Sequence, residues 1–128
     1  MSIDSGGPPH KPKFIDLWHL PEILELRVRR RRFDPAFRVT TEGVDLYVKD
    51  AVEIEINVAE PFAIRALGPV LWVGDEPLTV AESDGKNTYR FFAFKPEALR
   101  ANVPISLAWN SPGAQKTETR FRFTLPTE

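Results

Sequence analysis

The sequence predicts an all-β fold: an antiparallel sandwich of two sheets built from about eight strands. Apolar and polar residues alternate in many short runs along the chain, and this period of two is typical of half-buried strands. Turn-forming residues separate the runs at intervals of about ten residues, as in sandwiches and barrels. Only residues 95–102, "KPEALRAN", have a helical composition, and they suffice for one or two turns.

The strand signal is clearest in residues 52–58, "VEIEINV", where aliphatic residues lie on one face and glutamates and asparagine on the other. The segments "GVDLYVK" (43–49), "PISLAW" (104–109) and "TRFRFTL" (119–125) alternate in the same way. Further apolar runs complete a set of eight or nine candidate strands, and they begin at residues 23, 62, 69, 77 and 88.

Turn residues lie between these runs. "GDEP" (74–77) is so short that a hairpin is the natural interpretation, and "SDGKN" (83–87) offers Asp84 and Gly85 for the next reversal. "NSPG" (110–113) indicates a third reversal. We therefore expect consecutive antiparallel strands.

A chain of 128 residues has the size of one domain. Residues 1–13 are rich in glycine, proline and serine without periodicity, which predicts a flexible tail. Residues 14–24, "FIDLWHLPEIL", are apolar but contain Pro21, so we expect a short turn or an extended arm. The predicted organisation is a flexible tail with an apolar arm over residues 1–22 and a single sandwich domain over residues 23–128.

The order of segments over residues 51–125 resembles that of immunoglobulin-like or fibronectin type III-like domains. "PVLWV" (69–73) brings Trp72 to the place where such folds often keep a core tryptophan, and runs beginning at residues 88, 104 and 118 would supply the last three strands. The cysteine pair of antibody domains is absent. The resemblance implies binding rather than catalysis, and it names no partner.

The composition excludes several classes of function. The chain has no cysteine, so it has neither disulfides nor thiolate metal ligands. Its formal net charge of -1 argues against a dedicated nucleic-acid or membrane-surface protein, which needs a large basic excess. The first residues lack the apolar run of a signal peptide, and no segment is long and apolar enough for a membrane span. A cytoplasmic location is the resulting expectation.

Five of the seven residues in "RVRRRRF" (27–33) are arginines. Alternation with the apolar residues at 24, 26 and 28 places Arg27, Arg29 and Arg31 on the solvent face of a strand. If this strand lies beside residues 52–58, Glu53 and Glu55 become cross-strand partners, each pair worth roughly 0.2–1 kcal/mol. The other interpretations are a site for an anionic partner and an edge strand whose charges prevent pairing with other chains.

Alternation does not explain Arg30 and Arg32, which fall in the phase of Leu26 and Val28. Either the strand has passed the edge of the core at this point, or a bulge resets the alternation so that Phe33 turns inward. Both arrangements would cluster arginines at a rim.

No motif for catalysis, a metal or a cofactor occurs in the chain. The two histidines, His10 and His19, are isolated, and the spacings of zinc and calcium ligands are absent. Glu53 and Glu55 share a strand face and could form an acid–base pair, but alternating glutamates on an exposed strand more often serve solvation. We expect a protein without enzymatic activity, cofactor or metal.

Aromatic residues offer the remaining candidate surfaces. "YRFFAF" (89–94) carries rings on both faces, so one set needs cover from outside the main core. The apolar arm, with Trp18, can fold back over the sheet, or a second copy or another protein can supply the cover. Trp109, beside the "NSPG" turn, is the next candidate for a surface aromatic.

The function predicted first is a non-catalytic interaction or accessory module that binds another protein, or a second copy of itself, through a sheet face or the apolar arm. The alternative is a recognition domain for a small ligand or carbohydrate that uses aromatics near Trp109. The third is weak polyanion binding through the arginine run. The candidate binding residues are Phe14, Leu17, Trp18, Arg29, Arg30, Arg31, Arg32 and Trp109.

Overall fold

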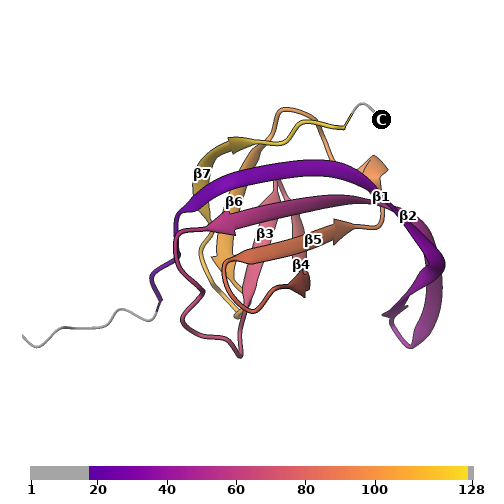
Figure 1. Ribbon diagram of the computed structural model, residues 1–128, viewed down its shortest axis with the longest axis horizontal. Coiled ribbons are helices and arrows are strands. Elements are labelled where there is room, and N and C mark those ends of the chain that lie inside the picture. Colours follow the sequence, from indigo (N-terminus) through magenta and orange to yellow (C-terminus); the bar gives the residue numbers. More distant parts are fainter. Residues whose placement is uncertain (1–17, 127–128) are drawn as a thin grey trace, which may run out of the picture.

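The computed structural model describes residues 18–126 and shows an all-β chain (Figure 1). Seven antiparallel strands form one sheet in the order β1-β2-β5-β4-β3-β6-β7. The strands are β1 (Ile23–Thr41), β2 (Val44–Val58), β3 (Pro69–Val73), β4 (Glu76–Ser83), β5 (Thr88–Ala93), β6 (Pro104–Trp109) and β7 (Thr117–Arg122). A 3-10 turn, η2 (Pro96–Ala98), occupies part of the segment predicted to be helical. Within the described residues, no helix is long and apolar enough to cross a membrane.

The sheet turns over on itself at β4. Residues 76–79 of this strand pair with β3, whereas the residues from Val80 onward pair with β5, and a register shift lies between Val80 and Glu82. In Figure 1, β1, β2 and β5 lie together in front of β3 and β6. Both groups contribute apolar side chains to one core, which therefore lies inside the folded sheet. The predicted all-β antiparallel architecture is confirmed.

The core follows from alternation along each strand. Ile54 of β2, Phe91 of β5 and Ile105 of β6 are fully buried, and their neighbours on the other face are not part of this cluster. Trp72 is only half-buried, because Leu71 and Val73 take the inward positions of β3. The core tryptophan that the resemblance implies is therefore not at this position.

The observed strands differ from the predicted ones in two places. The runs 43–49 and 52–58 are continuous in β2, so they count as one strand. Residues 62–67 form a loop, in which the backbone N–H groups of Leu67 and Gly68 both donate to the carbonyl of Ile64. Because these groups bond locally, they are not available to a strand ladder.

Two strand ends also deviate from simple alternation. Leu24, expected to face inward, is 51% exposed, because a register shift between Ile23 and Glu25 gives the buried position to Ile23. A second shift lies between Arg32 and Phe37. An irregularity of the kind considered in the second alternative therefore exists in this segment, but Phe33 is not part of the core cluster.

The outer aromatic residues at the end of β5 are covered by β1. The ring centroid of Phe37 lies 5.5 Å from that of Phe94 in a stacked arrangement, and Phe33 and Phe37 meet Phe92 edge-on at 5.2 and 5.8 Å. Phe92 is only 4% exposed as a result. The irregular segment after Arg32 allows both Phe33 and Phe37 to lie on this face.

The described part of the arm packs at a different place. Nε1 of Trp109 donates a hydrogen bond to the backbone carbonyl of Trp18 at 2.8 Å, and the two rings meet edge-on. Pro21 is buried. The tail predicted over residues 1–13, together with Phe14 and Leu17, lies outside the described residues.

The predicted reversals are confirmed. Gly74 and Asp75 alone connect β3 to β4, and Gly74 has a φ of 63° that favours glycine. Residues 110–116 connect β6 to β7. Asp84 organises the turn between β4 and β5, because its Oδ1 accepts hydrogen bonds from the backbone N–H groups of Lys86 and Thr88 at 2.7 and 3.1 Å. These two bonds stabilise the carboxylate and lower the pKa of Asp84 below its ordinary value of 3.8.

We expect the contribution of Asp84 to stability to depend on pH. Because folding lowers the pKa of this carboxyl, the stabilisation is fully present above the unfolded value and is lost as the pH falls through the folded value. Urea unfolding of Asp84→Asn should therefore show a lower midpoint than the parent at neutral pH. The difference should shrink as the pH falls below 3.8 and disappear once the pH is below the folded pKa. A difference that grows in acid would contradict this account of the turn.

Candidate functional site

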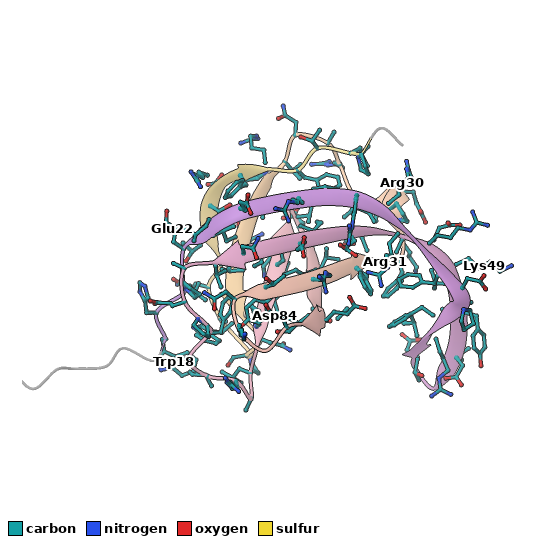
Figure 2. The ribbon with its side chains drawn as sticks, viewed as in Figure 1. Trp18, Glu22, Arg30, Arg31, Lys49 and Asp84 are labelled. Carbon is teal, nitrogen blue, oxygen red and sulfur yellow. The ribbon has the colours of Figure 1, made fainter. Side chains whose placement is uncertain are left out.

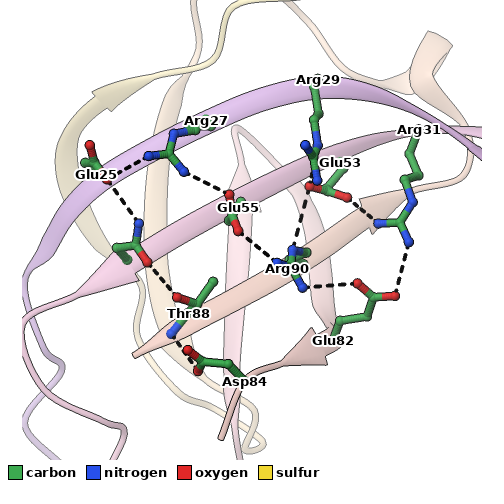
Figure 3. A network of polar contacts seen from close by, with 11 residues as sticks. Glu25, Arg27, Arg29, Arg31, Glu53, Glu55, Glu82, Asp84, Thr88 and Arg90 are labelled. Atoms are coloured by element: carbon green, nitrogen blue, oxygen red, sulfur yellow. Dashed lines mark hydrogen bonds and ion pairs between the residues drawn. The ribbon is translucent and has the colours of Figure 1, made fainter. Parts of the chain in front are cut away.

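A network of four arginines and four glutamates covers the outer face of β1, β2, β5 and β4 (Figure 3). The register of β1 with β2 places Arg27 opposite Glu55 and Arg29 opposite Glu53. Nη1 of Arg27 lies 3.2 Å from Oε1 of Glu55, and Nε of Arg29 lies 2.8 Å from Oε2 of Glu53. The expected cross-strand pairs are confirmed. The members of the network are Glu25, Arg27, Arg29, Arg31, Glu53, Glu55, Glu82 and Arg90.

Glu53 lies at the centre of this network. Its carboxylate accepts hydrogen bonds from Arg29 and Arg31, and Nε of Arg90 is 3.9 Å away. The side chain of Glu53 is 0% exposed. The expectation of a solvated Glu53 is therefore wrong, because the long arginine side chains of the neighbouring strands lie over the carboxylate and exclude water.

Arg90 and Glu82 complete the network from β5 and β4. Nη2 of Arg90 is 3.2 Å from Glu55, and its Nη1 is 3.4 Å from Glu82. Arg31 also reaches Glu82 at 3.4 Å. The hydrogen bond from Arg31 to Glu53 is the main cause that raises the pKa of Arg31 above its ordinary value. With as many glutamates as arginines, the network is neutral and presents no net charge to a polyanion.

Arg30 and Arg32 point to the opposite side of β1. Nη1 of Arg32 lies 3.9 Å from Oδ1 of Asp50, and both side chains are well exposed. Arg30 makes neither a hydrogen bond nor an ion pair with any residue between 18 and 126. It follows Leu26 and Val28 along the same face, where these two are only half-buried. The strand has thus passed the edge of the core at Arg30. This was the first of the two explanations that the sequence offered for Arg30 and Arg32.

Arg30 borders a groove of about 660 Å³ between β1 and the chain at the end of β7. β1 and β7 are the two ends of the seven-stranded sheet, and no ladder joins them. Nη2 of Arg120 donates to the carbonyl of Leu24 at 3.3 Å, so the two ends approach each other. The groove is lined by Leu26, Val28, Arg29, Arg30, Phe121, Arg122, Thr124, Leu125 and Pro126.

Arg122 supplies a second cation to this groove. Its Nε and Nη2 donate to the backbone carbonyl of Asn102 at 3.0 and 2.6 Å, and Nε also lies 3.3 Å from Oδ1 of Asn102. These acceptors are neutral, so they orient the guanidinium without compensating its charge. Arg30 and Arg122 therefore place two positive charges, without a carboxylate partner in the described chain, beside an apolar floor.

The other candidate residues lie elsewhere. Trp109 is only 6% exposed, because its ring packs against Phe62 and Trp18. Its expected role as a surface aromatic is contradicted by this burial. Trp18 is 59% exposed at the same end of the domain. Phe14 and Leu17 lie outside the described residues. The structure therefore brings the candidates together in two separate groups: the arginines of β1, and Trp18 with Trp109.

Sequence reasoning missed Arg90, Glu82 and Arg122. The alternation of "TRFRFTL" already places Arg122 on an outer face. Nothing in the local sequence pairs Arg90 or Glu82 with the arginine run, since they meet it only through the order of the strands.

Among the described residues, no cluster of histidine, aspartate or glutamate is arranged to hold a metal ion. The carboxylates of Glu53 and Glu55 are occupied by arginines, and a general base must instead have an oxygen free to reach a substrate proton.

The chain matches no protein-family model, no curated protein and no solved structure.

Replacing Glu53 by Gln should destabilise the fold more than the same change at Glu82. The change removes the one carboxylate that Arg29, Arg31 and Arg90 share. Breaking a buried ion pair typically costs 3–5 kcal/mol, and we expect about 2–3 kcal/mol because these arginines reach solvent. Because the side chain of Glu82 is 36% exposed, Glu82→Gln should lower the free energy of unfolding by less than about 1 kcal/mol. Urea unfolding measures both changes, and equal losses would show that the burial of Glu53 has no energetic consequence.

Proposed function

We propose that the chain is a non-catalytic interaction domain that binds an extended, acidic segment of another protein in the groove between β1 and β7. The observation that carries this proposal is the combination of an apolar floor with Arg30 and Arg122, whose charges have no carboxylate partner in the described chain. Such a surface favours a ligand that is both apolar and negatively charged.

The free edge of β1 supports an extended ligand. One edge of this strand is paired with β2, and the other faces the groove. An edge strand presents unpaired N–H and C=O groups that can bind an added strand. The backbone would supply affinity. Alternate side chains would give specificity, with apolar residues against Leu26 and Phe121 and carboxylates near Arg30 and Arg122.

For the fold, we infer a two-sheet sandwich of the immunoglobulin-like or fibronectin type III-like kind. Divided at β4, the observed order becomes β1-β2-β5-β4 and β3-β6-β7, which corresponds to the two sheets of an immunoglobulin constant-type domain. The pairing of β4 with both β3 and β5 fits a strand that passes from one sheet to the other. Folds of this kind serve many binding functions, so the inference agrees with a binding role without specifying it.

Two other functions have less support. Polyanion binding would need several free cations, whereas Arg29 and Arg31 are bonded to Glu53. Carbohydrate binding near Trp109 would need an exposed ring, and this ring is buried. A cytoplasmic location stays a prediction.

A short synthetic peptide in which Val and Glu alternate tests the groove directly. Titrated against the isotope-labelled chain, it should shift the amide signals of β1 and of residues 121–126 in NMR spectra. A Val–Lys peptide of equal length should not. Arg30→Glu should weaken binding of the acidic peptide by about tenfold or more, because it removes a charge-assisted contact.

Arg32→Glu is the matched control, since Arg32 belongs to the same run but does not line the groove. It should leave the affinity nearly unchanged. Equal losses for both variants would point to a diffuse charge effect. The proposal is wrong if the acidic peptide causes no shifts at millimolar concentration, or if a single-stranded oligonucleotide binds more tightly at the same residues.

A further inference from the structure

The hairpin formed by β1 and β2 leaves one edge of β2 without a partner near its tip. β2 pairs with β1 from Val44 to Val58, but its pairing with β5 begins only at Val52, opposite Ala93. The second edge of residues 44–51 therefore has no neighbouring strand in the described chain. In Figure 1 this hairpin projects beyond the other strands. A free edge of this length is a template for pairing with another chain.

Residues 45–49, "DLYVK", are complementary to themselves in the antiparallel direction. If Tyr47 lies opposite Tyr47 of a second copy, Leu46 comes opposite Val48, and Asp45 comes opposite Lys49. Each of these contacts then occurs twice, because the arrangement is two-fold symmetric. We propose that a second copy of the chain occupies this edge and that the two hairpins pair through residues 44–50 to form a homodimer.

Exposed apolar side chains support this pairing. Val44 is 57% exposed, Leu46 47% and Tyr47 67%. Val44, Leu46 and Val48 share one face of the strand, and Val48 continues that face towards Phe37, its partner in β1. In the dimer, Leu46 packs against Val48 of the second copy on this face, and the two Tyr47 rings meet on the other.

The charges select the same register. Lys49 makes neither a hydrogen bond nor an ion pair with another described residue, and it points away from the body of the domain in Figure 2. Asp45 accepts a hydrogen bond from Thr40 at 2.8 Å, while Arg38 stays 3.9 Å away. Its carboxylate therefore has capacity for a second cation. A register shifted by one residue would place Asp45 opposite Asp50 or Val48, according to its direction, and a shift by two would also lose both Asp45–Lys49 pairs.

Dimerisation and peptide binding use opposite edges of the hairpin strands. The groove lies at the free edge of β1, and the self-complementary segment lies on the free edge of β2. Either proposal can therefore fail without the other.

Tyr47→Cys tests the register, because the chain has no other cysteine. Residues directly opposite in an antiparallel pair have Cα atoms about 4.5–5.5 Å apart, and a disulfide accepts about 4.4–6.8 Å. Mild oxidation should therefore link Tyr47→Cys chains. Asp45→Cys is the control, because its counterpart in the second copy is displaced by four residues, or about 13 Å. Equal linking of the two variants would overturn the proposed register.

Charge exchange tests the dimer without a new cysteine. In sedimentation velocity over a concentration series, Lys49→Asp should weaken association by about tenfold or more, because it places like charges opposite each other twice. The double variant Asp45→Lys with Lys49→Asp should restore association. Lys95→Asp changes an exposed lysine outside the hairpin and should have no effect. A parent chain that stays monomeric throughout, or a double variant as weak as Lys49→Asp, would overturn the proposal.

Discussion

The pairing register of β1 with β2 is the constraint on which the other features depend. It places Arg29 opposite Glu53 on the outer face and Val28 opposite Ile54 on the inner face. A slip by one residue would exchange the two faces and bring an arginine towards the buried position of Ile54. The same register directs Arg30 to the groove. Ion pairs and core packing therefore specify one alignment together, and the groove is a consequence of it.

The network around Glu53 contributes more to the uniqueness of this alignment than to its strength. A buried carboxylate loses hydration, and its hydrogen bonds to Arg29 and Arg31 offset much of that loss without a large surplus. A register slipped by one residue in one direction, however, would bring Val28 opposite Glu53 in place of Arg29, and the carboxylate would lose these hydrogen bonds. The energetic penalty thus falls on the wrong alignments. This explains why the outer face of the sheet carries a neutral network of ion pairs, although separately hydrated polar side chains could also cover it.

Local alternation predicted that Arg29 and Glu53 lie on the outer faces of their strands and can pair if the strands are neighbours. The order of the strands supplies that condition. The burial of Glu53 could not be predicted, since it depends on Arg90, which a different strand brings to the site. Trp109 was misjudged for a similar reason: the residues that cover it, Trp18 and Phe62, are distant in sequence. The periodicity determines which face a side chain occupies, whereas the order of the strands determines what covers that face.

The two free edges of the β1–β2 pair differ in what they can accept. If the arginine-rich part of β1 paired antiparallel with its own copy, like charges would lie opposite each other, and such contacts are destabilising. This edge therefore disfavours a second copy, which agrees with the acidic strand that we propose as its ligand. Along residues 44–50, by contrast, opposite charges are placed symmetrically about Tyr47, so the β2 edge favours its own copy. The charge pattern of each edge thus discriminates between partners, although the backbone groups that would bind them are the same.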